Sequence, residues 1–390
     1  MDLFSAILDL AIIISLGVCC KIIAKMYRMP TSLLLIASGI ILRIFFDFFK
    51  AELLPANFIE LLSMFALAIL IFESALKIRH KEFDDFYISA LKFTGLAFIL
   101  TFIVLSPIID YLFSINFISA SIFAALVCGT SLPVLSPLFK NSKNEISKFL
   151  TIESMFNTII VLLVPFILFD LTSSFNTSFT TFLEFRMLLS PFLEKMIIGI
   201  GAGFIIGLLI VKLLNRHYLK TKSHLAFLFF SFIAYLLADR LEGQGIYAVA
   251  VVGIMFGNIV IKQKTQLHEY TSIISNVFES ILFILLGYMI NLEFNIFMFV
   301  YSFLIFATYI VLRYIALWLV LKSPHYTQEE RKVAAILSPK GLPTAIVIIV
   351  LISKGSLPTI TTLAFLVMVY SIIVSAYSLN ESKKILKTAV

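Results

Sequence analysis

Long hydrophobic runs dominate this 390-residue sequence and decide what it can fold into. A helix needs about 20 apolar residues to cross the hydrocarbon core of a bilayer, and charged or turn residues divide the chain into runs near that length. With 61% hydrophobic and 14% charged residues, the sequence predicts an all-α polytopic membrane protein with about thirteen transmembrane helices. The predicted segments are 4–27, 31–49, 57–77, 86–112, 116–139, 147–170, 187–215, 224–239, 244–261, 270–291, 295–321, 330–353 and 357–380.

Lysine and arginine residues are distributed unequally between the two sides of this predicted bundle. The loops after odd-numbered segments, together with the C-terminus, hold nineteen of them, whereas the loops after even-numbered segments hold four: Lys50, Arg186, Arg240 and Lys354. Because cytoplasmic loops are enriched in Lys and Arg, we expect the N-terminus outside and the C-terminus in the cytoplasm of a cell membrane. Topology therefore explains the net charge of +7, and no nucleic-acid partner is indicated.

The sequence shows no set of residues suited to enzyme, metal or disulfide chemistry. Cys19, Cys20 and Cys128 all lie in apolar runs, so neither a disulfide framework nor a zinc site is indicated. The chain has no Ser/His/Asp set, metal-ligand cluster or nucleotide-binding loop, and its five histidines fall in or beside the predicted cytoplasmic loops. We therefore expect no enzymatic activity, no cofactor and no resident metal.

Two predicted spans carry proline and glycine where a helix is difficult to maintain. Segment 116–139 contains Gly129–Pro137, and segment 330–353 contains Ser338–Pro343. Proline removes a backbone donor and disfavours helix just before it, and freed backbone groups are tolerated in a membrane only beside protein or water. If the first six and last six segments are two halves separated by the seventh, the halves have opposite topology and the breaks match. Such pairs indicate a secondary-transporter site, with two inverted six-helix repeats and crossed discontinuous helices.

Few charged residues lie in the middle of a predicted span, where a charge is costly and is functional by default. Arg313 lies in the middle of the eleventh segment, and Lys340 lies within the twelfth. Glu153 and Glu279 lie within apolar segments as well. These residues are therefore the first candidates for a site inside the membrane.

At the two breaks the chain resembles the monovalent cation:proton antiporter superfamily, in its bacterial and archaeal sodium/proton exchanger branch. The family pattern T-D-P-x-x-L-x-P-L-F is similar to the run Thr130–Phe139, and E-S-x-F-N-D is similar to Glu153–Thr158. The family arginine of the eleventh segment looks like Arg313, and the P-R-G pattern looks like Pro339–Gly341. Softer matches extend over almost the whole chain, in the same order and in the same segments as in the family.

The resemblance implies a homodimer in lipid that exchanges a monovalent cation, Na⁺ or K⁺, for protons by alternating access. Residues 1–390 would form a single transmembrane domain, with a scaffold of about 1–80 and 187–291 and a core of about 84–171 and 295–385. The core would carry one site across the membrane. The ion-binding residues, carried over by position, are Thr130, Ser131, Glu153, Ser154, Asn157 and Thr158, with Arg313 and Lys340 balancing charge.

The chain departs from the family pattern at residues that carry charge. The T-D aspartate is Ser131, the N-D aspartate, which is the usual ion and proton carrier, is Thr158, and the P-R-G arginine is Lys340. A threonine hydroxyl still offers an oxygen to a cation, but it does not titrate near neutral pH. The usual coupling group is therefore absent from its position, and Glu153 and Lys340 are the remaining titratable candidates.

Three interpretations stay open. The chain is a cation/proton antiporter whose titrating group has moved, a transporter of the same fold without proton coupling or with another solute, or a non-transporting regulatory subunit. The excess of Arg313 and Lys340 over Glu153 would even allow an anion as the solute. Under the first interpretation we expect Glu153, with Asn157 and neighbouring hydroxyl groups, to form the cation site. The alternative is that Glu153 and Arg313 neutralise each other as a structural pair.

Overall fold

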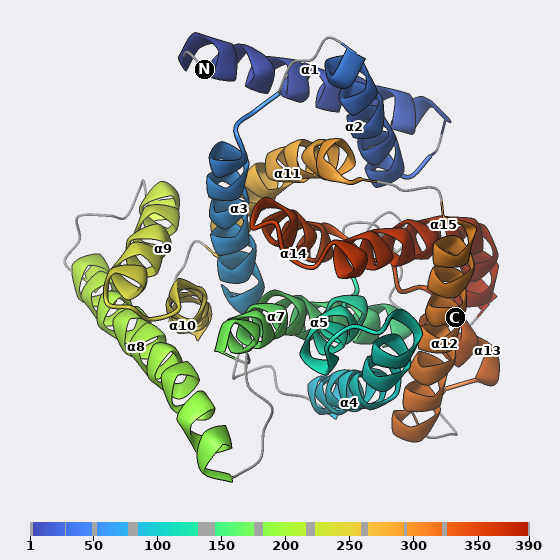
Figure 1. Ribbon diagram of the computed structural model, residues 1–390. Helices are drawn as coiled ribbons and strands as arrows, with labels where there is room; N and C mark the ends of the chain where they lie inside the picture. The colour runs from blue at the N-terminus through green and yellow to red at the C-terminus, as the bar shows by residue number, and fades with distance from the viewer. Residues whose placement is uncertain are drawn as a thin grey trace. The chain divides into compact units, whose positions relative to one another are not determined.

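The computed structural model (Figure 1) is a set of α-helices. It describes residues 3–27, 29–48, 53–76, 85–131, 145–174, 182–215, 223–258, 264–291, 295–321 and 326–388, and within these ranges no residue lies in a strand. The helices are α1 (Leu3–Tyr27), α2 (Thr31–Phe48), α3 (Ala56–Leu76), α4 (Asp85–Phe113), α5 (Phe117–Val127), α7 (Glu145–Ser174), α8 (Phe182–Asn215), α9 (Ser223–Arg240), α10 (Gly245–Asn258), α11 (Lys264–Met289), α12 (Ile296–Val320), α13 (Gln328–Ile336), α14 (Leu342–Ser353) and α15 (Pro358–Thr388).

The helices follow the predicted segments closely. Every one of the thirteen runs contains a helix, and most bounds agree within a few residues. Among the described helices, eight are long and apolar enough to cross a membrane, and α5, α10, α14 and the second half of α11 are shorter apolar helices. The predicted all-α polytopic membrane fold is therefore confirmed.

Polar side chains fix several helix starts at the ends of the apolar runs. Asn116 accepts a hydrogen bond from the backbone of Ile118 before α5, and Asn295 does the same for Phe297 before α12. Thr327 and Glu330 form a capping box at the start of α13, in which each side chain accepts from the backbone N–H of the other. Such caps satisfy backbone donors that the first turn of a helix leaves unpaired.

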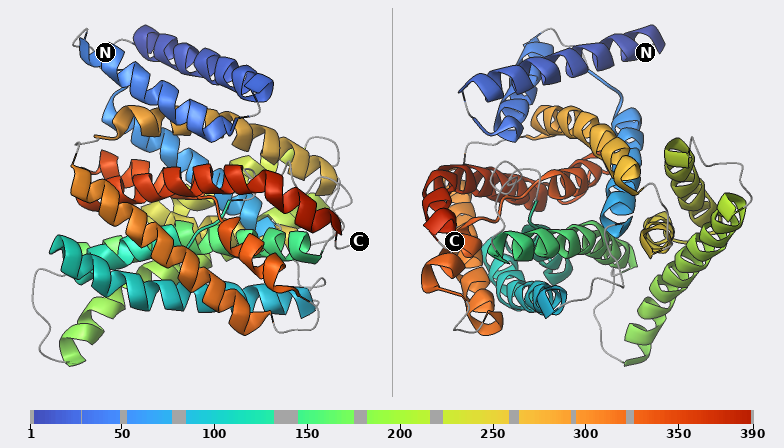
Figure 2. Two further views of the ribbon diagram at one scale, coloured as in Figure 1. Left: turned by 90° about the vertical axis from the view of Figure 1, so that its right-hand side faces the viewer. Right: turned by 180° about the vertical axis from the view of Figure 1, so that it is seen from behind.

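The chain divides into two compact units. The first comprises Met1–Ser63, Asp84–Val161 and Val277–Val390, and the second comprises Met64–Phe83 and Leu162–Asn276. In the second unit α8, α9 and α10 pack on one another. In the first unit α12 packs on α4, α13 and α15, and Figure 2 shows α12, in orange, running obliquely across α4, in cyan. The predicted division into scaffold and core stays a prediction.

An apolar layer in the first unit joins four helices beneath the polar residues described below. Phe93 from α4 and Phe149 from α7 lie at its centre, with their ring centroids 5.5 Å apart. Small residues from α12 and α13, including Ala316 and Ala334, complete the layer. The layer fixes α4, α7, α12 and α13 relative to one another, because close packing leaves such a core little freedom.

The two predicted breaks lie against each other in this first unit. After α5 ends, the chain continues without helix through Gly129–Ser131, and between α13 and α14 the segment 337–341 is not helical. The Ser131 N–H donates to the Pro339 carbonyl at 2.9 Å, and the Lys340 N–H donates to Ser371 Oγ on α15 at 2.9 Å. The freed backbone groups are thus satisfied by protein, as a membrane requires. Residues 132–144 lie outside the described residues, and the inverted repeat stays a prediction.

Two glycines allow the backbones of α2 and α11 to come into direct contact. Gly39 on α2 lies against Gly287 on α11, and a Cβ added to Gly39 would collide with the carbonyl oxygen of Ile284. A Cβ on Gly287 would collide in turn with the carbonyl oxygen of Ile36. Neither obstacle is a flexible side chain, so the two helices must separate to admit a methyl group. This is the small-residue packing that membrane helices use in place of a hydrophobic driving force.

We expect Gly39→Ala to destabilise the protein by about 1–3 kcal/mol, the usual cost of overpacking a core. Gly95→Ala is the matched control, because Gly95 lies inside α4 with no atom within 4 Å of an added Cβ. There the better helix propensity of alanine leaves stability unchanged or raises it. Thermal unfolding of the purified protein in detergent measures both variants. Equal melting temperatures for the two would refute the close approach of α2 and α11.

Candidate functional site

The three most deeply buried charged residues described in the first unit gather beside the crossing of the two breaks. Glu153 comes from α7, Arg313 from α12 and Lys340 from the segment between α13 and α14, and each is 1% exposed. These three residues are far apart in the sequence, and the packing of α7 on α12 beside the segment 337–341 brings them to one place. The site therefore combines one carboxylate and two cationic groups inside the protein.

Glu153 and Arg313 form a bidentate ion pair. The two guanidinium Nη atoms donate to the two carboxylate oxygens at 2.6 and 2.7 Å. Arg313 Nε donates to the Ala334 carbonyl of α13 at 3.3 Å, and the guanidinium lies 5.1 Å from the centroid of the Phe93 ring. Two parallel charge-assisted hydrogen bonds combine strength with a fixed geometry. The pair therefore ties α7 to α12 inside the bundle.

Two further predicted site residues donate to the same carboxylate. Asn157 Nδ2 donates to Glu153 Oε1 at 2.7 Å, and Thr130 Oγ1 donates to it at 3.1 Å. Asn157 Nδ2 also lies 3.1 Å from Thr130 Oγ1. The predicted grouping of Glu153 with Asn157 and Thr130 thus agrees with the observed contacts. Protein donors surround the carboxylate, while Asn157 Oδ1 is buried and accepts no hydrogen bond from the residues that the structure describes.

The two predicted site residues of α7 that carry a hydroxyl group, Ser154 and Thr158, bond to their own helix. Ser154 Oγ donates to the Thr151 carbonyl at 3.1 Å, and Thr158 Oγ1 donates to the Ser154 carbonyl at 2.7 Å. Thr158 is five residues after Glu153, which places it about 140° around the helix, and no hydrogen bond joins it to the Glu153 group within the described chain. Each of these hydroxyl oxygens still has lone pairs able to accept a further hydrogen bond or to bind a cation.

Lys340 is the unsatisfied charge of the site. Its Nζ lies 3.7 Å from the centroid of the Tyr309 ring, yet within the described ranges no acceptor forms a hydrogen bond with it. The side chain of Ser131 lies directly against Gly341, where a Cβ would collide with Ser131 Oγ. Position 131 therefore sits at the start of α14 beside Lys340, and a hydroxyl occupies it where the family pattern has a carboxylate.

Sequence reasoning missed Tyr309 and Ser338, which also belong to this site. Tyr309 is 1% exposed and lies four residues before Arg313, on the same face of α12. Its hydroxyl and Ser338 Oγ lie close enough to interact with each other, and neither bonds to any other residue in the described part of the chain. The i, i+4 spacing from Arg313 was a usable signal for Tyr309, whereas a serine in a chain break carries no such signal.

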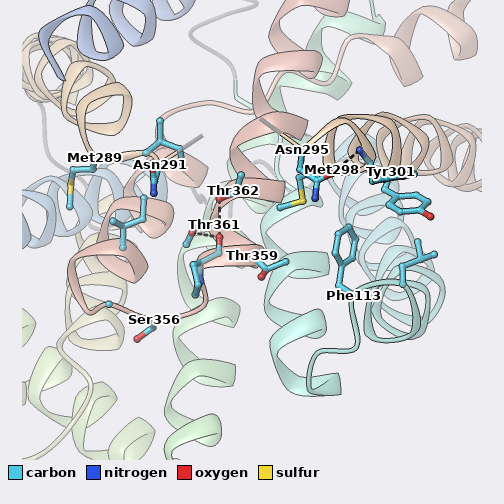
Figure 3. A pocket seen from close by; sticks show the side chains of 16 residues that line it. Phe113, Met289, Asn291, Asn295, Met298, Tyr301, Ser356, Thr359, Thr361 and Thr362 are labelled. Atoms are coloured by element: carbon cyan, nitrogen blue, oxygen red, sulfur yellow. Dashed lines mark hydrogen bonds between the residues drawn. The ribbon is translucent and has the colours of Figure 1, made fainter. Parts of the chain in front are cut away.

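A separate pocket of about 620 Å³ lies at the other end of α14 (Figure 3). Its lining comes from the end of α4, the connection between α11 and α12, and the start of α15, and includes Phe113, Asn291, Asn295, Tyr301 and Thr359. None of the predicted site residues lines this pocket, and its described lining carries no charged side chain. The charged site at the crossing and this pocket are therefore distinct places in the first unit.

In the described part of the chain, no three His, Cys, Asp or Glu side chains lie close enough together to bind a metal ion. The polar atoms at the crossing are instead carboxylate, amide and hydroxyl groups beside two cationic side chains. Oxygen atoms of these kinds replace the water around a hard monovalent cation, as carbonyl oxygens do in ion channels. The site is therefore suited to ions without a resident metal.

The sequence and the fold match known proteins over most of the chain. The profile of the family described as "sodium/hydrogen exchanger, transmembrane" matches residues 11–380. The chain is 26% identical over 297 residues to the low-affinity Na(+)/H(+) antiporter NhaS1 of Synechocystis sp., covering 73% of this chain and 54% of that protein. It is 28% identical over 303 residues to the Na(+)/H(+) antiporter ApNhaP of Aphanothece halophytica, covering 72% and 54%. The chain thus spans about half the length of these two curated relatives.

The solved structure of the sodium proton antiporter MjNhaP1 from Methanocaldococcus jannaschii has the same fold. It superposes with a TM-score of 0.78 over 97% of both chains, at 18% sequence identity. At this identity the likeness concerns the fold, so the chemistry of the site must be argued from the residues present here.

Removing one member of the Glu153–Arg313 pair leaves the other charge buried without its partner, which costs about 3–5 kcal/mol. We expect Glu153→Gln and Arg313→Gln each to lower the free energy of unfolding by about that amount. The double variant should lose less than the sum of the two, because neither charge remains. Thermal unfolding in a double-mutant cycle measures the coupling, with Glu329→Gln as an exposed control at the start of α13. Additive losses would contradict the pairing.

Proposed function

Since the chain belongs to the sodium/hydrogen exchanger family, we propose that it is a secondary transporter that exchanges Na⁺ or K⁺ for protons across a cell membrane by alternating access. The observation that carries this proposal is the buried charged site at the crossing of two broken helices. Broken helices of this kind offer backbone and side-chain oxygens near the middle of a membrane. The membrane lipid, the cation and the proton are then the partners of the chain.

The cation site of this proposal lies around Glu153. Thr130, Asn157 and the hydroxyl groups of α7 supply neutral oxygen atoms, and Asn157 Oδ1 is a buried acceptor with no hydrogen bond from the described residues. Glu153 is the one carboxylate of the group. Exchange requires that cation binding and protonation of this carboxylate exclude each other. Arg313 holds Glu153 in the described state, so the proposed cycle includes a state in which that pair is loosened.

The resemblance to the family supports further parts of the proposal. The proposed assembly is a homodimer in which the core of each protomer moves while its scaffold stays fixed. The scaffold comprises about 1–80 and 187–291, and the core comprises about 84–171 and 295–385. The distribution of lysine and arginine supports an N-terminus outside and a C-terminus in the cytoplasm.

Transport is tested with the purified protein in lipid vesicles that carry an imposed pH gradient. We expect Na⁺, Li⁺ or K⁺ to dissipate the gradient, and we expect Glu153→Gln to reduce this flux more than tenfold, because one titratable group is removed. Glu329→Gln, an exposed glutamate on α13, is the matched control and should transport normally. A folded Glu153→Gln protein with unchanged rate and pH dependence would leave the Glu153–Arg313 pair structural and the proposed cation site wrong.

Thr158→Asp tests, by a gain of function, whether the fold of this chain supports cation/proton exchange. It restores the carboxylate of the family pattern on α7, and we expect a higher cation-driven proton flux than in the parent protein. No flux in the parent together with no gain in Thr158→Asp would favour the non-transporting regulatory subunit.

The orientation is tested with single cysteines in a Cys19→Ser background and a thiol reagent that does not cross membranes. Glu242, after α9, and Glu329, on α13, are both exposed. Glu242 follows the eighth predicted segment, on the predicted outer side, and Glu329 follows the eleventh, on the predicted cytoplasmic side. We expect Glu242→Cys to be labelled in intact cells and Glu329→Cys only after the membrane is made permeable. The reverse pattern would invert the topology.

A further inference from the structure

We propose that a small inorganic anion of the halide class binds at the crossing, between the Lys340 ammonium and the hydroxyl groups of Tyr309 and Ser338. All three residues are 1% exposed. Lys340 Nζ has no hydrogen-bond partner within the part of the chain that the structure covers, and the Tyr309 hydroxyl and Ser338 Oγ, which lie near each other, bond to no other described residue. An ammonium group only donates, and a hydroxyl can donate. A buried ammonium group without a hydrogen-bond acceptor in the described chain, beside two hydroxyl groups, therefore matches a single acceptor that carries negative charge.

The positions of these donors fit one ligand. Lys340 and Ser338 are two residues apart in the segment 337–341, and Lys340 Nζ lies 3.7 Å from the Tyr309 ring centroid. Buried polar groups are nearly always hydrogen-bonded in folded proteins. A shared ligand relieves all three groups at once.

The net charge of the site also favours a bound anion. Arg313 and Lys340 bring two positive charges, and Glu153 brings one negative charge that Arg313 already engages through both oxygens. A buried charge without a partner is costly. An anion beside Lys340 makes the site neutral without disturbing the bidentate pair.

The start of α14 adds positive potential beside Lys340. Gly341 is the N-cap of this 12-residue helix and provides no side-chain hydrogen bond, and Pro343 in the first turn has no N–H to donate. The remaining first-turn donors and the helix dipole favour negative charge at this end. The helix end adds to the attraction for an anion, whereas the buried Lys340 ammonium, which has no hydrogen-bond acceptor among the described residues, is the main binding group.

The anion replaces a carboxylate that this chain lacks. Ser131 lies directly against Gly341, so an aspartate at position 131 would place its charge at the start of α14 beside Lys340. With serine there, a mobile anion takes over that charge. Only the consequence for transport rests on the proposed function: a neutral site admits a cation, whereas an excess positive charge repels it.

Chloride is the probe, and thermal unfolding of the purified full chain in detergent is the measurement, so no transport is required. Chloride replaces gluconate at constant ionic strength and constant Na⁺. We expect the melting temperature to rise saturably, by about 2–4 °C, because a ligand that binds only the folded protein stabilises it. Tyr309→Phe should need about fivefold more chloride for the same effect, the equivalent of one lost hydrogen bond.

Two variants and one control make the assignment specific. Lys340→Gln should abolish the chloride response, whereas Lys332→Gln, which removes an exposed lysine from α13, should keep it. Ser131→Asp should lose the response while staying folded without chloride, because its carboxylate takes the place of the anion. A melting temperature independent of chloride in the parent protein, or a full response in Lys340→Gln, would overturn the proposal. A chloride response together with failed cation transport would support the anion site and refute the proposed function.

Discussion

The bidentate contact between Arg313 and Glu153 holds together the elements on which the rest of the site depends. It joins α12 to α7, and Arg313 also bonds to the Ala334 carbonyl of α13. Through Thr130 the same carboxylate reaches the break after α5. In a low-dielectric interior such a network is strong when every member is satisfied and costly when one is lost. A single ion pair thus links two helices to α13 and to the break after α5.

The breaks themselves need a second constraint, which is close backbone contact. The Ser131 N–H bonds to the Pro339 carbonyl, and this approach is possible because residue 341 has no side chain to meet Ser131. Without such contacts the non-helical segments would carry unsatisfied groups, which a membrane interior does not tolerate. The site therefore lies at a crossing where two irregular segments satisfy part of each other's backbone hydrogen bonding.

Much of this arrangement follows from the sequence, and the rest depends on tertiary contacts. The hydrophobic runs determined the helices, the Gly and Pro residues located both breaks, and the i, i+4 spacing placed Asn157 on the face of Glu153. The partner of Glu153 came from resemblance to the family. The approach of Lys340 and of Ser338 to Tyr309 arises where α12 meets a non-helical segment. No periodicity describes such a segment, so its contacts were not predictable from spacing.

The charge of the site separates this chain from the pattern it resembles. The family pattern sets two aspartates and one glutamate against two arginines, which leaves one excess negative charge suited to a cation. Here Ser131 and Thr158 are neutral, so Glu153 faces Arg313 and Lys340, and the excess is one positive charge. Two units of charge have changed while the helices and the crossing persist. Because the cost of an unpaired charge in this interior is large, the proposed cation transport and the proposed anion beside Lys340 belong together: the anion supplies negative charge that this chain lacks. The same arithmetic explains why Lys340, and not Glu153, is the residue left without a partner.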